Sequence, residues 1–306
     1  MQSGMGQRTA VAVAGSLNLD VVMPVPHHPR PGETVLGGDH TRHPGGKGAN
    51  QAVAAARLGQ HVTMLGRVGD DDAGSFLTGM LDSAGVDTSA VTVTPQTPTG
   101  MAYIAVDEAG ENTIIVSPGA NGMFSAGDVA SSAAVLADAD VTLLQLEVPL
   151  DTVEAAARAA GGTVVLNPAP ARELRPALLD AVDVLVLNET ELEVLAGQQL
   201  PSGNLDGIVD LSRRINGPDA IVVTLGARGA LLVDSEGVSY VPAVEVDVVD
   251  TTAAGDAFCG ALADALVRRE GLGAAVRWAT RAAAVTVTRD GAQPALPSRD
   301  DVENVR

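Results

Sequence analysis

The sequence predicts an α/β fold, with a mostly parallel central sheet, helices on both faces and a small β-sheet lid. Short runs of β-branched and aliphatic residues alternate with Ala-rich helical stretches along almost the whole chain, which is the pattern of strands joined by crossover helices. Two stretches interrupt this alternation with Val, Thr and Ile residues and Pro-Gly punctuation but no helical periodicity. We expect these two stretches to form the lid.

The predicted elements follow the chain in order. Apolar runs predict core strands at Thr9–Ala14, Val62–Gly66, Val141–Leu146, Thr163–Leu166, Val184–Leu187 and Ala220–Leu225. Ala-rich stretches predict helices at Ala49–Leu58, Ala73–Ala84, Leu150–Ala160, Glu189–Ala196, Gly255–Arg269 and Ala274–Thr288. The lid strands are predicted within about 19–43 and 99–116. Because there is no internal repeat or long linker, we expect one domain over 1–306, with residues 1–8 as a disordered tail.

The composition limits the possible partners. A chain of 306 residues that is 46% hydrophobic can bury a large core. Its formal net charge of −19 argues against nucleic acid, because phosphate backbones are bound by clustered Lys and Arg, and only 2% of its residues are aromatic, too few for a base-stacking platform. ATP remains a possible ligand, since phosphate binding depends on the local field at a site rather than on total charge.

The chain shows no signal for a membrane, a disulfide or a structural metal. No apolar run approaches the roughly 20 residues that span a bilayer. The first residues lack the basic-then-apolar pattern of a signal peptide, so we expect a cytoplasmic location and no membrane partner. Cys259, the single cysteine, cannot form an internal disulfide, and with five scattered histidines it offers no zinc-like cluster. We interpret it as core packing.

The segment Asp250–Phe258 carries the strongest chemical signal. Its small residues, Thr-Thr-Ala-Ala-Gly, precede an Ala-rich helix, so backbone N–H groups can converge on a phosphoryl group while the helix N-terminus adds partial positive charge. Asp256 lies in the first turn, where it can accept the proton of an attacking hydroxyl. The alternative is that Asp256 only favours the helix dipole and that Gly255 is a turn glycine.

The Gly-rich segment Gly45–Gln51 leads into another predicted helix. It is not a Walker A loop, because Thr41 stands where that motif needs its first glycine and Gly48 stands where it needs Ser or Thr. Lys47 and Asn50 supply donors that suit the hydroxyls of a sugar. The alternative is a Gly-rich helix start with a solvated lysine.

Two polar segments follow predicted strands at the sheet edge where open α/β sheets bind ligands. Asn188 and Glu191 lie one helical turn apart and offer oxygens that suit hydrated Mg²⁺ on ATP, although an ordinary capping box has the same sequence and both roles can coexist. Gly226 and Gly229 form a turn where a nucleotide could lie against the backbone, with a plain β-turn as the alternative.

A third polar segment follows the first predicted strand. The residues Gly15–Asp20 offer Asn18 and Asp20 as partners for hydroxyl groups. The alternative is that both side chains only form turns.

In this order, these motifs resemble the ribokinase (PfkB) family of carbohydrate kinases. The resemblance extends from the first strand to Pro297. Within the family, the segments Gln145–Glu147, Asn167–Leu174 and Thr288–Pro294 are similar to ribokinases in particular. The resemblance implies a ribokinase-like fold and an ATP-dependent kinase that phosphorylates D-ribose at its 5-hydroxyl.

The resemblance also implies a role for each matched position. The catalytic positions are the base Asp256 and an anion hole at Ala253, Ala254 and Gly255. The sugar-binding positions are Ser16, Asn18, Asp20, Gly45, Gly46, Lys47, Asn50, Glu147 and Asp256. The positions around ATP and Mg²⁺ are Asn188, Glu191, Thr224, Gly226, Gly229, Gly255 and Thr280. An activating K⁺ would be held, mostly by backbone carbonyls, at Asp250, Thr252, Thr286, Arg289, Gly291 and Ala295.

The resemblance further implies a homodimer formed through the lid. The rival functions are a kinase of the same family acting on 2-deoxyribose, fructose, a 2-keto sugar acid or a nucleoside, and a non-catalytic sugar-binding regulator on the same fold. A sugar-acid kinase would need a basic group for the carboxylate, and the candidate pocket offers only Lys47. An NAD-dependent oxidoreductase is excluded, because Gly15 is followed by Ser-Leu-Asn and not by a Gly-x-Gly-x-x-Gly turn.

Overall fold

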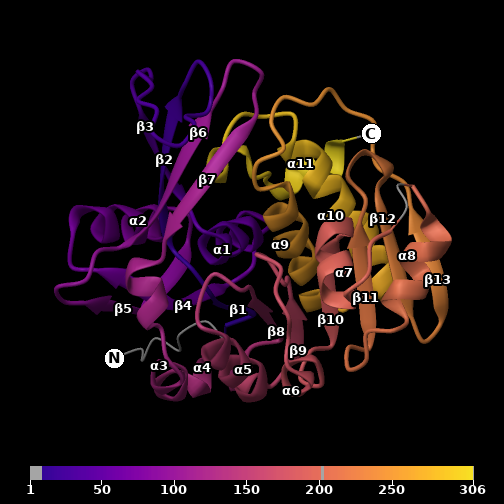
Figure 1. Ribbon diagram of the computed structural model, residues 1–306. Coiled ribbons are helices and arrows are strands. Elements are labelled where there is room, and N and C mark those ends of the chain that lie inside the picture. The colour runs from indigo at the N-terminus through magenta and orange to yellow at the C-terminus, as the bar shows by residue number, and fades with distance from the viewer. Residues whose placement is uncertain (1–8, 201–202, 306) are drawn as a thin grey trace.

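The alternating elements build one large sheet. The computed structural model describes residues 9–200 and 203–305, and in it nine strands pair in the order β13-β12-β11-β10-β9-β8-β1-β4-β5. Strands β11, β10, β9, β8, β1, β4 and β5 run parallel to one another, whereas β12 and β13 are added antiparallel at one edge (Figure 1). In spatial order the strands are Gly237–Val241, Ala230–Asp234, Ala220–Thr224, Val184–Asn188, Thr163–Leu166, Val141–Leu144, Val11–Ala14, Val62–Gly69 and Val86–Thr94.

Side-chain alternation along the strands divides the core into two layers. On β1, Val11 and Val13 pack on one face of the sheet, and Ala12 and Ala14 on the other. The first face is covered by α1 (Lys47–Arg57), α2 (Asp72–Ser83), α9 (Ala254–Val267), α10 (Leu272–Thr286) and α11 (Arg299–Asn304). The second is covered by α3 (Ala126–Ser131), α4 (Ala133–Asp138), α5 (Leu150–Ala159), α6 (Pro176–Leu179), α7 (Glu189–Ala196) and α8 (Leu205–Ser212). The predicted α/β architecture is confirmed.

A separate four-stranded sheet forms the predicted lid. Its strand order is β3-β2-β6-β7, and the bounds in that order are Thr41–Gly45, Asn18–Pro24, Gly100–Val106 and Asn112–Ser117. Strands β2 and β6 run parallel to each other, and both outer pairs are antiparallel. Figure 1 shows these strands projecting from the end of the central sheet, above α1 and α2. Since β2 begins four residues after β1 ends, one segment of chain passes directly from the central sheet into the lid.

The structure also contains elements that the sequence prediction missed. Strand β5 is mostly polar and half-exposed, so it carries no continuous apolar run. The antiparallel strands β12 and β13, the short helices α3, α4, α6, α8 and α11, and the 3₁₀ turns η1 (Gly119–Met123), η2 (Gly226–Arg228) and η3 (Gln293–Ala295) were also absent from the prediction. Elements of one or two turns are too short for a periodic pattern to identify them. The predicted tail, residues 1–8, lies outside the described residues.

Strand direction gathers the polar motifs at one edge. Strands β1, β8, β9, β10 and β11 are parallel, so the segments after them emerge together at the carboxyl edge of the sheet, where ligand sites of open α/β sheets lie. Helices α1 and α9 pack against each other on one face. No helix in residues 9–200 and 203–305 is long and apolar enough to cross a membrane.

Candidate active site

Helix α9 begins after a turn of small residues. Ala253, the residue before the helix, has φ of 59° and provides no side-chain cap. This left-handed conformation costs an L-residue about 1–2 kcal/mol. The Ala254 N donates weakly to Thr251 O at 3.3 Å, whereas the N–H groups of Gly255 and Asp256 have no partner within the described residues, and the helix dipole favours an anion beside them. A Cβ at Gly255 would have nothing within 4 Å, so the turn is open. This geometry suits the predicted anion hole of Ala253, Ala254 and Gly255.

Asp256 lies in the first turn of α9 and is only 6% exposed. Its Oδ2 accepts a hydrogen bond from Asn50 Nδ2 at 3.0 Å, and its Oδ1 accepts one from Gln51 Nε2 at 3.1 Å. Burial raises the pKa of Asp256 above its ordinary value, while the charge of Lys47 and the two amide donors oppose that rise. The carboxylate is thus held by donors on α1, which fix its direction.

Lys47 and two further carboxylates share this side of the site. Burial opposes the charge of Lys47, but the carboxylates of Asp256 and Glu147, with a contribution from Glu191, raise its pKa above the ordinary value. Burial, assisted by Glu147 and Asp256, raises the pKa of Asp20 to about 7. Within the described residues the Asp20 carboxylate has no hydrogen-bond partner, so it is available for a ligand.

Glu147 is fixed by three donors on one of its oxygens. Glu147 Oε2 accepts hydrogen bonds from Ser16 Oγ at 2.5 Å, from the backbone N of Lys47 at 3.0 Å and from Asn18 Nδ2 at 3.4 Å. These donors come from the β1–β2 connection and from the start of α1. The predicted sugar-binding positions Ser16, Asn18, Lys47, Asn50 and Glu147 therefore meet in one cluster.

Asn121 belongs to the same cluster, and sequence reasoning missed it. It lies in η1 and is 1% exposed. Its Nδ2 donates to Leu17 O at 3.0 Å and to Asn18 Oδ1 at 2.8 Å, and its Oδ1 accepts from Leu17 N at 3.0 Å. Asn18 therefore presents its nitrogen, not its oxygen, toward Glu147. The residue stands in a polar segment between two short elements, which gave no motif.

The glycines of the Gly45–Gln51 segment are required by close packing. Gly46 has φ of 90°, and a Cβ there would lie 2.7 Å from the backbone N of Asn18. A Cβ at Gly45 would lie 2.0 Å from Asp20 Oδ2. Both glycines therefore let β2 approach the start of α1, with Gly45 against Asp20 and Gly46 against Asn18, and their sugar-binding role stays a prediction.

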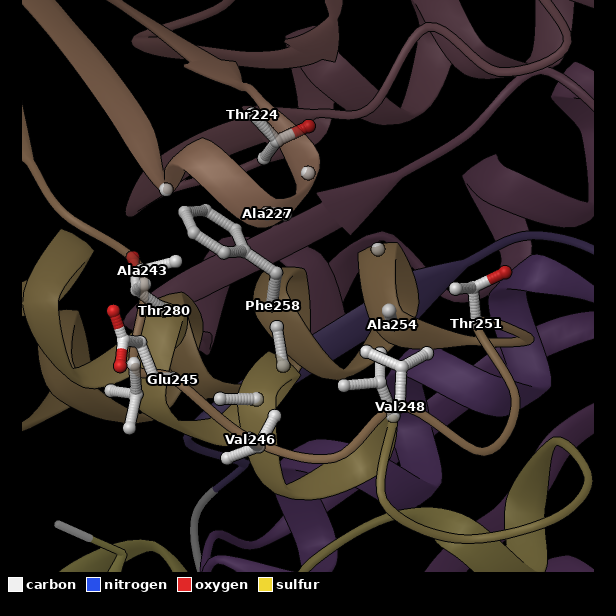
Figure 2. Close-up of a pocket in the computed structure, with 17 residues that line it drawn as sticks. Thr224, Ala227, Ala243, Glu245, Val246, Val248, Thr251, Ala254, Phe258 and Thr280 are labelled. Atoms are coloured by element: carbon white, nitrogen blue, oxygen red, sulfur yellow. The ribbon is translucent and has the colours of Figure 1, made fainter.

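On the other side of the first turn of α9 lies a cavity of about 460 Å³. Figure 2 shows it between the turn carrying Thr224 and Ala227, the loop from Ala243 to Val248, and helices α9 and α10. The predicted nucleotide positions Thr224, Gly226, Gly229, Gly255 and Thr280 all line this cavity. Most other lining groups are apolar, including Phe258, Ala283 and Val287. The Thr280 hydroxyl donates to Val276 O at 2.8 Å, so it faces a ligand only as an acceptor.

Asn188 and Glu191 form a complete capping box at the start of α7. Asn188 Oδ1 accepts from the Glu191 N at 2.8 Å, and Glu191 Oε2 accepts from the Asn188 N at 2.9 Å. Neither residue lines the cavity, but the Glu191 charge acts on Lys47. The capping alternative is confirmed, and the role near Mg²⁺ stays a prediction that the geometry permits, because Glu191 Oε1 and the second lone pair of Asn188 Oδ1 can still bind a hydrated ion.

The predicted cation positions lie on the loop before α9 and on the adjoining segment from the end of α10 to η3. Asp250 Oδ1 accepts from the N and Oγ1 of Thr252 at 2.9 and 2.7 Å, and its Oδ2 accepts from the Gly291 N at 2.9 Å. The Thr286 hydroxyl donates to Ala282 O, Arg289 pairs with Asp301 at 2.8 Å, and Ala295 is buried in η3. The Asp250 carboxylate therefore joins the two segments, and their backbone carbonyls are the oxygens that could bind K⁺. Within the described residues, no group of three or more His, Cys, Asp or Glu side chains could hold a metal.

Three amide side chains behind Asp256 were assigned no role from the sequence. They are Gln51, Gln145 and Asn167. All three stand inside segments that carried the family resemblance, so their position was visible although their contacts were not. Cys259 is buried one helical position beyond Phe258, and burial raises the pKa of its thiol, as expected for a packing residue.

Asp256 lies beside an uncapped helix N-terminus, with a polar cluster on one side and an open cavity on the other. This arrangement is that of a phosphotransferase for a small hydroxyl compound. A family model described as pfkB family carbohydrate kinase matches residues 8–299. The chain therefore belongs to the pfkB family of carbohydrate kinases.

The individual relatives are similar along almost their whole length. The chain is 39% identical to the ribokinase of Haemophilus influenzae, over 96% of this chain and 97% of the relative. It is 40% identical to the deoxyribokinase of Salmonella typhi, over 94% of this chain and 95% of the relative. The structure of Arabidopsis thaliana ribokinase complexed with ribose and ATP superposes with a TM-score of 0.91 at 31% identity, covering 98% of this chain and 99% of that one.

Proposed function

We propose that this chain transfers the γ-phosphoryl group of ATP to the 5-hydroxyl of D-ribose. The observation that carries the proposal is the place of Asp256, between the polar cluster of Asp20, Lys47 and Glu147 and the cavity lined by the first turn of α9. The ribokinase of Haemophilus influenzae and the ribose and ATP complex of the Arabidopsis thaliana enzyme support this choice of sugar and donor.

In the proposed reaction, Asp256 orients the 5-hydroxyl and receives its proton. The sugar oxygen forms a bond to the γ-phosphorus while the bond between that phosphorus and the bridging oxygen of ADP breaks. The N–H groups at the start of α9 stabilise the charge on the transferring group. A loose transition state needs an oriented nucleophile more than a strong base, so a buried carboxylate fixed by Asn50 and Gln51 is sufficient.

The polar cluster supplies the groups that bind the sugar. The Asp20 carboxylate is without a hydrogen-bond partner among the described residues, and a carboxylate can accept from two hydroxyls. Asn50 Oδ1 is buried and has no hydrogen-bond partner among the described residues, so it can accept a hydrogen bond from a sugar hydroxyl. Asn18 and Lys47 add donors. Both donors and acceptors are therefore present, as a polyol requires.

The cavity is the proposed ATP site, with Asn188 and Glu191 beside the phosphates and their Mg²⁺. Magnesium would neutralise phosphate charge in the transition state. For K⁺, the segments around Asp250 and Gly291 fit a carbonyl-lined site, because the Asp250 carboxylate accepts from backbone N–H groups of both segments and leaves backbone oxygens for an ion. Bound K⁺ would order the loop that leads into α9.

2-Deoxyribose is the acceptor that competes most closely with ribose. The deoxyribokinase of Salmonella typhi is about as similar to this chain as the ribokinase of Haemophilus influenzae is. The two sugars differ by one hydroxyl, so a single lost hydrogen bond separates them. Ribose is favoured because the buried acceptors of the cluster would lose a partner with the deoxy sugar.

We also propose a homodimer formed through the lid. Tyr103 on β6 and its partner Ile115 on β7 lie on one face of the lid sheet, and Ile114 and Val116 lie on the other. All four are between 47% and 67% exposed, so each face carries apolar side chains that a second lid would cover. A cytoplasmic location is proposed because ATP is the donor. Light scattering after size-exclusion chromatography would test the dimer, with Ile115→Asp expected to shift it to monomer.

ADP release with Mg²⁺ and ATP tests the function directly, with D-ribose, 2-deoxyribose, fructose and adenosine as separate acceptors. We expect ribose to give the highest kcat/KM and K⁺ to raise it. A preference for another acceptor would overturn the choice of sugar, and no turnover with any acceptor would favour a non-catalytic regulator. An unchanged rate on replacing K⁺ with an inert ion such as tetramethylammonium would contradict the cation site.

A further inference from the structure

Behind Asp256 lies a connected group of amide side chains that the proposed reaction does not itself use. Gln51 is on α1, and Gln145 and Asn167 follow β8 and β9. Gln51 and Gln145 are both 0% exposed. Their only route to the reacting atoms is through Asp256, to which Gln51 Nε2 donates at 3.1 Å.

The direction of the Gln51 amide is fixed at both ends. Its Oε1 accepts from Gln145 Nε2 at 2.6 Å. Its Nε2 faces Asp256 and, at 3.5 Å, Asn167 Oδ1. Asn167 is itself oriented, because its Nδ2 donates at 3.0 Å to the backbone carbonyl of Val186, which can only accept. A rotated Gln51 would bring oxygen against Asn167 Oδ1 and nitrogen against Gln145 Nε2.

The Gln145 amide points its nitrogen at Gln51 although its own oxygen has no partner. Gln145 Oε1 is buried and has no hydrogen-bond partner within the described residues. A buried carbonyl without a partner destabilises a fold, and an apolar side chain of similar volume would avoid that penalty. An apolar side chain would, however, leave the buried Gln51 Oε1 without its donor, so the bond that Gln145 makes within the described residues is the one that orients Gln51.

We propose that Gln51 is a positioning residue for Asp256, and that Gln145 and Asn167 set the direction of its amide so that an N–H, never a carbonyl, faces the catalytic carboxylate. The proposal rests on the proposed kinase function. An amide carbonyl at that place would favour the protonated acid, which cannot receive the proton of the sugar hydroxyl.

The charges around Asp256 show why this donor matters. Lys47 on α1 favours the ionised carboxylate, whereas Glu147 after β8, Asp20 on β2 and the buried Cys259 on α9 are further titratable groups that act on it or on its neighbours. Burial raises the pKa of Asp256, and the donors Asn50 and Gln51 lower it. Loss of one donor leaves burial less opposed, so Asp256 should become harder to ionise.

The first test is the pH dependence of kcat/KM for Gln51→Met. One hydrogen bond to a charged group corresponds to about 1–2 pH units, so the acid limb should move to higher pH by about that amount. Above the limb, kcat should recover to within about tenfold of the parent, and the KM for the sugar should change less than about threefold. A uniform loss of rate at every pH, with the limb unmoved, is the result of a merely structural role and would overturn the proposal.

Gln60→Met is the matched control. Gln60 Nε2 donates at 2.7 Å to Asp264, a fully buried carboxylate two turns further along α9 and away from the site. The variant removes the same kind of bond from a buried carboxylate on α9 that keeps Arg268 and Arg299 as partners. Its pH limb should match that of the parent.

The direction of the amide is tested by the double variant Gln145→Met with Asn167→Leu, which keeps Gln51 but removes both groups that orient it. Its acid limb should move in the same direction as that of Gln51→Met, by a smaller amount. An unmoved limb in the double variant would refute the role of the two orienting residues. The double variant also serves if Gln51→Met does not fold.

A readout independent of turnover separates this inference from the proposed function. The Asp256 carboxyl can be titrated by ¹³C NMR of protein labelled at aspartate, with Asp256→Asn used to assign its signal. We expect a higher pKa in Gln51→Met than in the parent protein. An equal pKa would overturn the inference whatever the activity, whereas a parent protein that phosphorylates no sugar would overturn the proposed function and leave this titration interpretable.

Discussion

The two sides of the α9 N-terminus recognise their ligands in different ways. On the sugar side, the pKa values of Asp20 and Lys47 are both shifted by neighbouring charges, and Glu147 is fixed by the Asn18 amide and the Lys47 backbone N. On the nucleotide side, the cavity is lined mostly by apolar side chains and glycine backbone. The sugar side therefore selects by the direction of hydrogen bonds, whereas the nucleotide side selects by shape, and single substitutions should affect only the ligand of their own side.

The largest expected effect is that of Asp256→Asn, which removes the proton acceptor and keeps the shape. General acid–base groups contribute about 10²–10⁴-fold, so kcat should fall by about 10³. Ribose binding, measured by calorimetry, should weaken less than about tenfold because Asn50 and Lys47 remain. A kcat within tenfold of the parent would show that orientation of the hydroxyl does not depend on this carboxylate.

Asp20→Asn tests whether the sugar and the nucleotide are recognised separately on the two sides of the α9 N-terminus. It should raise the KM for ribose by about 10–100-fold, the effect of one hydrogen bond to a charged group, and leave the KM for ATP unchanged. The KM for ribose in the parent should fall as pH rises through about 7, where Asp20 ionises, and this dependence should be lost in the variant. An equal change in both KM values would contradict separate recognition.

The raised pKa of Asp20 also has a stability consequence with a definite sign. A carboxyl whose pKa rises from 3.8 to about 7 on folding contributes stability that is complete below about pH 3.8 and is lost as pH rises through about 7. In the absence of ligands, Asp20→Asn should therefore gain thermal stability relative to the parent between pH 5 and pH 8. Calorimetric Tm values across that range give the measurement, and parallel curves for the two proteins would contradict the pKa.

A smaller effect is expected on the nucleotide side from Ala283→Leu. Ala283 lines the cavity on α10, and the added atoms should raise the KM for ATP by about tenfold while the KM for ribose stays constant. Ala274→Leu, on the same helix but outside the cavity lining, is the control and should change neither KM. Steady-state kinetics with each substrate varied in turn decides between the two.

Much of the fold was predictable because the core strands have a clear apolar pattern in the sequence. Val184–Leu187 and Val164–Leu166 are buried on both faces of the sheet, so they form continuous apolar runs in the sequence. Strand β5 was not predictable in this way, since its pairing with β4 at the sheet edge needs no apolar run. The lid was predicted from its lack of helical period, but the parallel pairing of β2 with β6 depends on contacts distant in sequence.

Site residues were predictable where they stand in a motif within one continuous segment of sequence. Asp256 and Lys47 stand in recognisable motifs, whereas Asn121 lies more than a hundred residues from its partner Asn18 and has no motif of its own. The amides behind Asp256 show the same limit. Gln51 is adjacent to Asn50 in sequence, but its contact with Gln145 exists only because α1 lies over β8 in the folded chain.

The chain passes directly from β1 in the central sheet to β2 in the lid, so movement of the lid also changes the distances between carboxylates in the site. Asp20 lies on β2, the second strand of the lid sheet, whereas Glu147 and Asp256 belong to the central body. Any displacement of the lid therefore separates Asp20 from the other two carboxylates. Above about pH 7, where Asp20 ionises, Glu147 and Asp256 repel it and Lys47 attracts it, so we expect the balance of these charges, together with a sugar hydrogen-bonded across the gap, to set how far the lid opens.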